Sequence, residues 1–294
     1  MKNYNVKKLR YRISRFVAHC LPDKLYLSIK FYTKMGYWMN WKKPQTFCEK
    51  IQWLKIYNRH EEYTEMVDKY AVKKYVAQRI GQEFLIPTLG IFDNIDDIDF
   101  SKLPDKFVLK CTHDSGGLIV CRDKNKLNIE ATKEKLRKGL ERTYIIQNRE
   151  YPYKQVPRRI IAEEYIQTDS GSDLIDYKFF CFNGRAEYCQ VIANRTTDES
   201  IDFYNRNWEH QEFIGLLPTA HHAPTEHDMP KNYNKMLNIA DKLASEISSP
   251  FVRIDLYNVK GKIYFGEITF FPATGIGQFR PAEWDLRLGE MIKL

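Results

Sequence analysis

The sequence lacks an apolar run long enough to cross a membrane. No segment of its 294 residues approaches the ~20 consecutive apolar residues that a membrane-spanning helix needs. The opening residues, MKNYNVKKLRYRISRF, are interrupted by charges too often for the apolar stretch of a signal peptide. We therefore expect a cytoplasmic protein rather than a secreted or membrane-spanning one.

Cysteine is sparse and shows no paired motif. The cysteines lie at positions 20, 48, 111, 121, 181 and 189, without any C-x-x-C pair. Irregular spacing in a chain of this length favours reduced thiols with structural roles, as in a reducing compartment.

Common nucleotide-binding and nucleic-acid-binding signatures are also missing. No G-x-G-x-x-G follows a predicted strand, and there is no P-loop. Arg-rich tails, zinc-finger spacings and RNA-recognition signatures are absent too, which argues against nucleic acid. The formal net charge is nevertheless +8, and positive charge is densest among residues 2–15. This excess suits phosphorylated small molecules or an anionic membrane face.

The composition is that of a chain that can fill a core. Hydrophobic residues make up 43% and aromatic residues 14%, so we expect little disorder. Thr46 begins a capping box, and Gly81 is placed to form a left-handed helix cap. Apolar periodicity and these caps predict helices over 1–35, 46–60, 68–79, 130–143 and 233–247. The first of these is basic and amphipathic, and either packs on the body or lies on a membrane face.

Predicted strands alternate with these helices. Two hairpins are expected, one turning at Asn183-Gly184 and one near Lys260-Gly261. Single strands are predicted for FLIPTLGIF, KFVLKCT, LIVCRD and RRIIAEEYI. Mixed helices and antiparallel hairpins favour an α+β fold over a doubly wound parallel sheet.

The closing hairpin carries two carboxylates in a mostly apolar setting. Arg253 and Asp255 share a face of the strand VRIDLY, because side chains alternate along a strand. If the turn pairs the strands, Glu267 on KIYFGEITF lies close to Asp255. Magnesium with ATP phosphate oxygens would hold two such carboxylates together. The alternative is a pair of neighbouring surface carboxylates.

A glycine-containing loop follows the strand FVLKCT. Lys110 lies near the strand end, and Ser115, Gly116 and Gly117 follow. Glycines let backbone N–H groups curve around an anion, and lysine adds a mobile charge. The segment is either a phosphate-binding loop or an ordinary turn beside a lysine.

The segment IIAEEYIQ combines apolar residues with two adjacent glutamates. Adenine needs apolar walls and a few hydrogen bonds at its edge, and Glu163 or Glu164 would add one. The alternative is a strand end that emerges into solvent.

Four histidines follow at positions 210, 221, 222 and 227. Their spacing matches no common zinc pattern, so we expect a loop with scattered histidines.

Together these motifs resemble the ATP-grasp superfamily, whose enzymes hold ATP between two α+β lobes. The resemblance runs from about Asp68 to Glu290. Asp68-Lys69 looks like the family's D-K pair, which implies that Lys69 contacts a phosphate, and Lys110 looks like its strand lysine. The resemblance implies a glycine-rich loop at Ser115, Gly116 and Gly117, and an adenine-holding hinge at Glu163, Glu164, Tyr165 and Ile166.

The same resemblance assigns roles in the closing hairpin. Its strands are similar to the family's R-x-D and E-x-N strands, so Asp255 and Glu267 are implied to bind Mg²⁺. Arg253 would steady the transferring phosphoryl group or the acyl phosphate. Thr269 stands where the family has the third ligand, Asn, so its hydroxyl would ligate metal or hold a water.

Within the superfamily, GEITFFPATG and DYKFFCFNG look most like the TupA-like group, which is associated with bacterial cell-surface polysaccharides, including teichuronopeptide. The string NIDDIDFSKLPDKFVLKCTHDSGG is also similar to that group. By this resemblance Lys178 and Arg195 line the cleft and take part in catalysis. The expected layout is an N-terminal helical segment over 1–65, a linker helix and small lobe over 66–162, and a large lobe over 163–294.

The function that follows is an ATP- and Mg²⁺-dependent ligase forming an amide through an acyl phosphate. Its partners would be ATP, an amine, and a carboxylate such as a sugar uronate, free or linked to a lipid or nucleotide. It would act in capsule, exopolysaccharide or cell-wall synthesis at the inner face of the membrane. Two alternatives stay open: a glycosyltransferase of the same pathway, and an ATP-binding module without chemistry.

Overall fold

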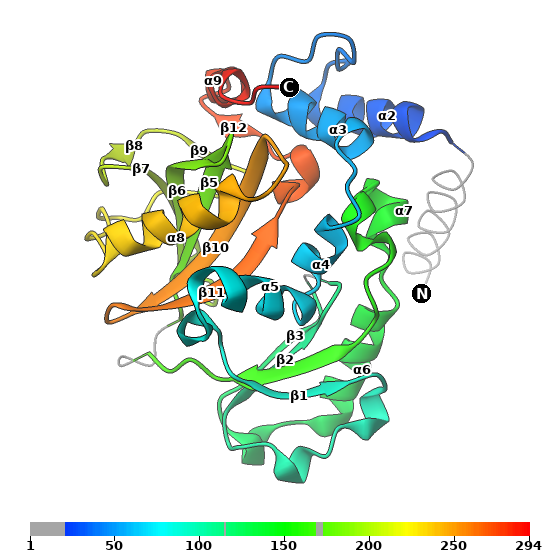
Figure 1. The fold of residues 1–294 in the computed structure, drawn as a ribbon, viewed down its shortest axis with the longest axis vertical. Helices are drawn as coiled ribbons and strands as arrows, with labels where there is room; N and C mark the ends of the chain where they lie inside the picture. The colour runs from blue at the N-terminus through cyan, green and yellow to red at the C-terminus, as the bar shows by residue number, and fades with distance from the viewer. Residues whose placement is uncertain (1–20, 115, 169–172) are drawn as a thin grey trace.

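The computed structural model describes residues 21–114, 116–168 and 173–294. The expected basic helix over 1–35 therefore falls partly outside the described residues, and what is described of it is α2 (Asp23–Met35). Two large antiparallel sheets organise the described part of the chain, one above the other in Figure 1. No helix among the described residues is both long and apolar enough to span a bilayer.

The larger sheet has six strands in the order β11-β10-β5-β6-β7-β8. Its strands are β5 (Asp176–Phe182), β6 (Arg185–Ala193), β7 (Ser200–Asn205), β8 (His210–Gln211), β10 (Phe251–Val259) and β11 (Lys262–Thr269). A separate two-stranded ladder joins β9 (Ile214–Gly215) to β12 (Phe279–Arg280). Both predicted hairpins are present, and Asn183, Gly184, Lys260 and Gly261 all have positive φ, as tight two-residue turns require.

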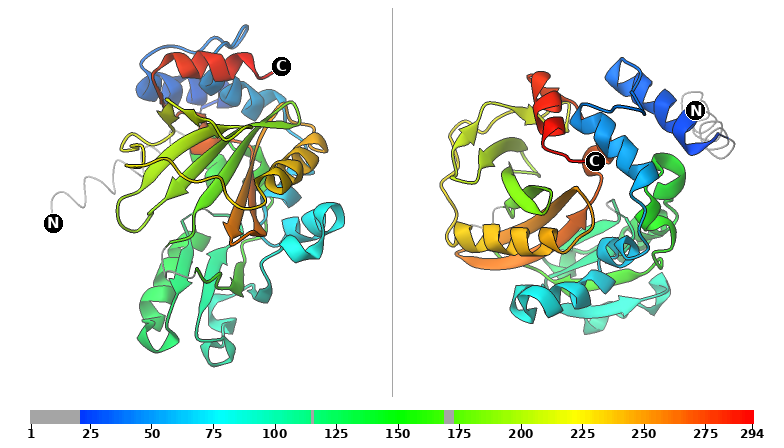
Figure 2. Two further views of the ribbon diagram at one scale, coloured as in Figure 1. Left: turned by 90° about the vertical axis from the view of Figure 1, so that its left-hand side faces the viewer. Right: turned by 45° about the horizontal axis from the view of Figure 1, so that its top comes forward.

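Helix α8 (Tyr233–Ser245) covers one face of the larger sheet (Figures 1 and 2). Its buried side chains recur every three or four residues, which is the pattern of a helix with one apolar face. They are Tyr233, Met236, Leu237, Ile239, Ala240, Leu243 and Ala244. The ring of Tyr233 stacks on Phe179 of β5, so Phe179 marks the face that α8 covers.

The opposite face of β5 carries Lys178 and Phe180, because side chains alternate along a strand. At one end of this face Phe180 packs near Phe47 of α3 (Phe47–Tyr57), and α9 (Glu283–Glu290) lies beside α3 in Figure 1. The predicted capping box is confirmed: Thr46 accepts a hydrogen bond from the Glu49 N–H, and Glu49 accepts one in return.

The smaller sheet has four strands in the order β1-β4-β2-β3. They are β1 (Thr88–Phe92), β2 (Phe107–Cys111), β3 (Leu118–Cys121) and β4 (Ile160–Glu164), with α6 (Ile129–Leu140) packed beside them and α7 (Tyr144–Asn148) following. A separate core with Phe107, Leu109, Leu136 and Ile160 holds this lobe together. The expected boundary between lobes at residue 163 falls inside β4.

Helices α4 (Tyr63–Val67) and α5 (Ala71–Ile80) connect the N-terminal helices to the smaller sheet. Helix α5 begins later than predicted, because Asp68 accepts hydrogen bonds from the backbone N–H groups of Tyr70 and Ala71 and so caps its first turn. Gly81 has φ 111° and ψ 155°, so the expected left-handed cap is wrong although its positive φ still suits glycine.

Other local predictions are met in part. The strand predicted for FLIPTLGIF shortens to β1, because Pro87 has no N–H to donate to a ladder. All cysteines among the described residues are buried and free, as expected for structural thiols. Short 3-10 helices complete the chain: η1 (Gln82–Phe84), η2 (Ile95–Asp97), η3 (Phe100–Lys102), η4 (Lys124–Lys126), η5 (Tyr151–Lys154) and η6 (Pro272–Gly275).

Candidate nucleotide and metal site

The β10–β11 hairpin brings the two predicted carboxylates together. Asp255 and Glu267 are direct cross-strand partners, and Arg253 is opposite Thr269 in the same ladder. On the other side of β10, Asp255 is paired with Lys178 of β5. The four charged residues therefore share one face of the larger sheet, the face that α8 does not cover.

Arg253 occupies the centre of this group. Its Nε donates to Asp255 Oδ1 at 2.6 Å, and its Nη2 donates to Asp255 Oδ2 at 2.8 Å. The same Nη2 lies 3.0 Å from Glu267 Oε1 and 3.1 Å from Thr269 Oγ1. Three oxygen ligands from three residues thus converge on a single cationic nitrogen.

A line of alternating charges extends from Asp255 along β5. Lys178 Nζ donates to Asp255 Oδ2 and lies 3.4 Å from Asp176 Oδ1. Arg195 then donates from Nε to Asp176 Oδ2 at 2.6 Å. Lys178 therefore contacts the carboxylate pair directly, whereas Arg195 reaches it only through Asp176 and Lys178.

Burial and charge act in opposite directions on these groups. Burial raises the pKa of Asp255, and Arg253 and Lys178 oppose that rise. Burial would also raise the pKa of Glu267, but Lys69, Lys178 and Arg253 hold it well below the ordinary value of a glutamate. Glu267 is thus ionised at neutral pH, with about a third of its side chain exposed (36%).

These residues fit a magnesium ion. Mg²⁺ takes hard oxygen ligands, commonly one or two carboxylates with phosphate oxygens. The oxygens of Asp255, Glu267 and Thr269 already converge on one positive centre, the Arg253 Nη2. A metal could take these oxygens only after the guanidinium withdraws.

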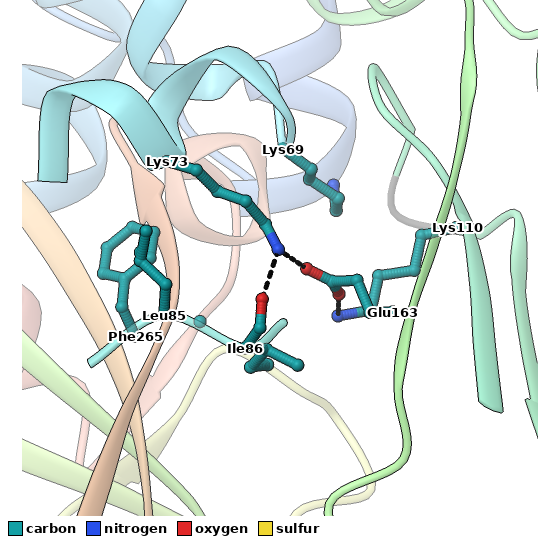
Figure 3. Close-up of a pocket in the computed structure, with 8 residues that line it drawn as sticks. Lys69, Lys73, Leu85, Ile86, Lys110, Glu163 and Phe265 are labelled. Carbon is teal, nitrogen blue, oxygen red and sulfur yellow. Dashed lines mark hydrogen bonds and ion pairs between the residues drawn. The ribbon is translucent and has the colours of Figure 1, made fainter. Parts of the chain in front are cut away.

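A small pocket lies between the two sheets (Figure 3). It is lined by Lys69, Lys73, Leu85, Ile86, Lys110, Glu163, Phe265 and Gly266. Buried Glu163 of β4 lies between two lysines, with Oε1 2.5 Å from Lys73 Nζ and Oε2 2.7 Å from Lys110 Nζ. Phe265 of β11 forms an apolar wall from the larger sheet. The pocket thus combines apolar walls with a concentration of positive charge.

Lys69 connects this pocket to the carboxylate hairpin. Its Nζ donates to the Asp114 carbonyl oxygen at 2.9 Å and lies 3.9 Å from Glu267 Oε2. Its backbone N–H donates to the Thr112 carbonyl oxygen at 3.1 Å. Lys69 therefore joins the loop after β2 to the larger sheet, and its contact with a phosphate stays a prediction.

The glycine-containing loop is partly outside the description, because Ser115 is not among the described residues. A Cβ on Gly117 would lie 2.5 Å from the Cys111 sulfur, and one on Gly116 would meet the Arg142 guanidinium. Buried Asp114 accepts from Arg142 Nη1 at 3.2 Å. Close packing therefore accounts for Gly117, whereas the Arg142 side chain could move away from a Cβ at Gly116. A phosphate-binding role for this loop stays a prediction.

The predicted adenine hinge follows β4. Glu164 is exposed and its backbone N–H donates to the Pro87 carbonyl oxygen, while Ile166 is buried and Tyr165 is half-buried. Because Lys73 and Lys110 occupy both oxygens of Glu163, the hydrogen bond to adenine expected from a Glu163 side chain would have to replace an ion pair.

Sequence reasoning missed Lys73 and Phe265. Lys73 follows Lys69 by four residues in the helix that the sequence predicted over 68–79, and this spacing could have indicated a shared direction, although Lys69 precedes α5 in the structure. Phe265 pairs with Leu256 whereas Glu267 pairs with Asp255, so the β-bulge at Gly266 breaks the alternation and strand spacing gives no signal for Phe265. Leu85 and Ile86 give no such signal, because they lie in an irregular segment.

The expectation of scattered histidines is wrong. His210, His222 and His227 all contact the carboxylate of Asp202, whereas His221 pairs with Asp198. Chain spacing missed this group because a β hairpin and a returning loop bring its members together.

The sequence Asp97-Ile98-Asp99 has the D-x-D spacing of many glycosyltransferases. Here Asp97 accepts the Asn94 N–H at 3.3 Å and Asp99 accepts the Ser101 N–H at 3.0 Å, so both carboxylates cap 3-10 turns in the small lobe. This geometry gives no support to the glycosyltransferase alternative.

Two α+β lobes with antiparallel sheets, a lysine-lined pocket between them and a carboxylate hairpin define the ATP-grasp class of fold. A family model described as TupA-like ATPgrasp matches residues 49–293. The chain therefore belongs to the TupA-like ATP-grasp family, which confirms the resemblance. No curated protein matches the chain significantly.

Solved structures of similar fold include several ligases. The D-alanine–D-alanine ligase from Bacillus anthracis complexed with ATP is 16% identical, with a TM-score of 0.39, over 70% of this chain and 54% of that one. The corresponding ligase from Helicobacter pylori is 14% identical, with a TM-score of 0.42, over 84% and 69%. An L-amino acid ligase from Bacillus licheniformis is 14% identical, with a TM-score of 0.44, over 78% and 50%. The chain thus spans about half the length of the first and third of these proteins.

Proposed function

We propose that the protein is a Mg²⁺- and ATP-dependent carboxylate–amine ligase that acts through an acyl phosphate. The observation that carries this proposal is the convergence of three oxygen ligands on Arg253 Nη2, on the sheet face toward which Lys69 extends from the lysine-lined pocket. Such a site can hold a metal and a polyphosphate side by side, which a ligase that activates a carboxylate requires.

In this proposal some residues bind the nucleotide and others stabilise the negative charge of its phosphates. Lys69 and Lys110 would hold phosphate oxygens from the small-lobe side, and the segment 163–166 would hold the adenine. Bound at Asp255 and Glu267, Mg²⁺ would neutralise charge on the phosphates. Arg253, released from those carboxylates, would stabilise the phosphoryl group in transfer.

The proposed chemistry proceeds in two displacements. A substrate carboxylate oxygen attacks the γ-phosphorus of ATP, the bond to the β-phosphate oxygen breaks, and ADP leaves with its electron pair. The amine nitrogen then attacks the acyl carbon, inorganic phosphate leaves, and the nitrogen loses a proton. Positioning and charge stabilisation account for this reaction without a covalent enzyme intermediate. Lys178 would keep Asp255 oriented throughout, and Arg195 would support Lys178 through Asp176.

The family resemblance supports a uronic-acid carboxylate and an amino acid or amine as substrates. It also supports a role in bacterial capsule, exopolysaccharide or cell-wall polymer synthesis, in the cytoplasm at the inner membrane face. Contact with the membrane through the basic N-terminal residues stays a prediction, because residues 1–20 lie outside the described part of the chain.

Nucleotide binding provides the direct test. Calorimetric titration of the full chain should show ATP binding that requires Mg²⁺, with no response to UDP-glucose or GDP-mannose. Glu267→Ala should abolish this Mg²⁺-dependent ATP binding, because it removes one converging oxygen ligand. Binding of a sugar nucleotide without any response to ATP would overturn the ligase proposal.

Replacing Lys110 by Met is expected to weaken ATP binding by about 10- to 100-fold, because a charge-assisted contact to a phosphate contributes about 1.5–3 kcal/mol. Lys106→Met is the matched control: Lys106 precedes the same strand, is exposed, and bonds only to Gln167 among the contacts described. Calorimetry on both variants, each checked by thermal unfolding, measures the effect. Equal affinities in the two variants would remove Lys110 from the phosphate site.

A further inference from the structure

A second cluster of ligand-type side chains lies away from the nucleotide site. Asp202 lies on β7, His210 on β8, and His222 and His227 on the loop that leads to α8. Asp202 pairs with Val191 of β6, and Val191 pairs with Tyr177 of β5, so these three residues form one cross-strand row. Tyr177 and Phe179 are two residues apart on β5, so their side chains point to the same face. This row is on the face of the sheet that α8 covers, whereas Lys178 and Asp255 are on the opposite face.

The carboxylate of Asp202 is the centre of the cluster. Its Oδ1 lies 3.0 Å from His210 Nε2 and 2.8 Å from His222 Nδ1, and its Oδ2 lies 3.3 Å from His227 Nε2. Only 2% of the Asp202 side chain is exposed. Ligand atoms of Asp202, His210 and His222 all lie within 4.8 Å of one another.

Hydrogen bonding alone does not satisfy this cluster. His227 Nε2 is buried and has no hydrogen-bond partner of acceptable geometry, although it lies against the carboxylate. Four ligand atoms around a tetrahedral zinc, with bonds of about 2.0–2.1 Å, lie roughly 3.3–3.4 Å apart. The His227 contact, at 3.3 Å, matches that spacing, whereas the contacts of His210 and His222, at 3.0 and 2.8 Å, are shorter and would lengthen around a metal.

Surrounding groups hold the ligands in place. The His227 backbone N–H donates to the Tyr204 hydroxyl at 2.7 Å, and its carbonyl oxygen accepts from Trp208 Nε1 at 2.9 Å. The rings of Tyr204 and Trp208 stack at 4.2 Å. A ligand set with such orienting contacts behaves as a preformed site rather than as mobile surface histidines.

We propose that Asp202, His210, His222 and His227 bind a divalent transition metal, Zn²⁺, in a structural site. Asp202, His210 and His222 supply three ligand atoms that lie close together, and His227, beside the second oxygen of Asp202, is the candidate for the fourth position of a tetrahedral zinc. The metal would fasten the loop from His222 to His227 onto β7. This site is independent of the ligase proposal, because it lies on the other face of the sheet.

The test is metal titration of the untagged full chain after chelation. Wild-type protein should bind Co²⁺ with the visible absorption of tetrahedral cobalt, should release it to Zn²⁺, and should melt at a higher temperature with Zn²⁺. His222→Asn should weaken Zn²⁺ binding by at least about 100-fold, because loss of even an outer contact costs about 10- to 100-fold.

His221→Asn is the matched control, since His221 is the adjacent residue, is exposed and pairs with Asp198. It should bind Zn²⁺ as the wild type does. Glu267→Gln changes the carboxylate hairpin and not the histidine cluster, so this variant should also bind Co²⁺ with the visible absorption of tetrahedral cobalt. A wild type without tetrahedral cobalt absorption, or a His222→Asn variant that binds Zn²⁺ as tightly as His221→Asn, would overturn the proposal.

Discussion

Replacing Asp255 by Asn is expected to lower ATP turnover by about 10²- to 10³-fold, the cost of removing one electrostatic contact to a transferring phosphoryl group. Asp255 is 2% exposed and is contacted by both Arg253 and Lys178. Asn at this position would be a weaker ligand for the proposed metal than Asp. It would also leave the buried cations Arg253 and Lys178 without their carboxylate partner. ADP formation under saturating ATP and Mg²⁺ measures the effect.

Loss of folding could imitate that result, so a buried carboxylate outside the cleft is the control. Asp285 is 8% exposed and accepts the Cys48 backbone N–H at 2.9 Å, away from the carboxylate hairpin. Asp285→Asn should lower the melting temperature without changing turnover per folded molecule. Glu267→Gln, at a more exposed position, should lose turnover with less effect on stability. Turnover that survives Asp255→Asn would show that the metal assignment is wrong.

Local signals in the sequence predicted the hairpin part of the site. Asn183-Gly184 and Lys260-Gly261 fix two tight turns, and a tight turn fixes the register of the strands beside it. The turn at Lys260-Gly261 alone would place Asp255 opposite Gly266, and a β-bulge at Gly266 shifts the register so that Asp255 pairs with Glu267. Turn chemistry therefore predicted the hairpin, whereas the bulge that completes the carboxylate pair was not predicted.

The pairing of charges could not be predicted in this way. Glu163 is held by Lys73 from a helix and by Lys110 from a neighbouring strand, and only the packing of α5 against the small lobe brings these together. Arg253 likewise shares a face with Asp255 by alternation, but alternation does not say that its guanidinium contacts Asp255, Glu267 and Thr269 together. The tertiary structure determines which carboxylates the long, flexible side chains of lysine and arginine contact.

The histidine group around Asp202 also could not be predicted from the spacing of its residues along the chain. Chain spacing argued against a zinc site, because common zinc motifs place ligands at short, regular intervals. Asp202, the residue that His210 and His222 share, gave no signal as a single acidic residue in a strand. The β7–β8 pairing positions one histidine and the returning loop positions the others.

Replacing Glu163 by Gln is expected to destabilise the protein by about 3 kcal/mol near neutral pH, because removing one partner of a buried ion pair leaves an uncompensated charge. Without the Glu163 carboxylate, the positive charges of Lys73 and Lys110 would repel each other within the pocket. Urea unfolding of the variant and the wild type measures the difference. Glu164→Gln is the control, because the neighbouring side chain is exposed, and it should change stability by no more than about 0.5 kcal/mol.

The destabilisation should also depend on pH with a definite sign. Burial would raise the pKa of Glu163, but Lys110 and Lys73 outweigh burial and hold this pKa below the ordinary 4.5. A carboxylate with a depressed pKa in the folded state stabilises the protein fully above its unfolded pKa, and that contribution disappears as the pH falls through the folded value. The gap in unfolding free energy between wild type and Glu163→Gln should therefore be constant above about pH 4.5 and shrink below it. A gap that does not change on acidification would mean that the Glu163 charge does not stabilise this lobe, and the lysines would then be available to a nucleotide without competition from Glu163.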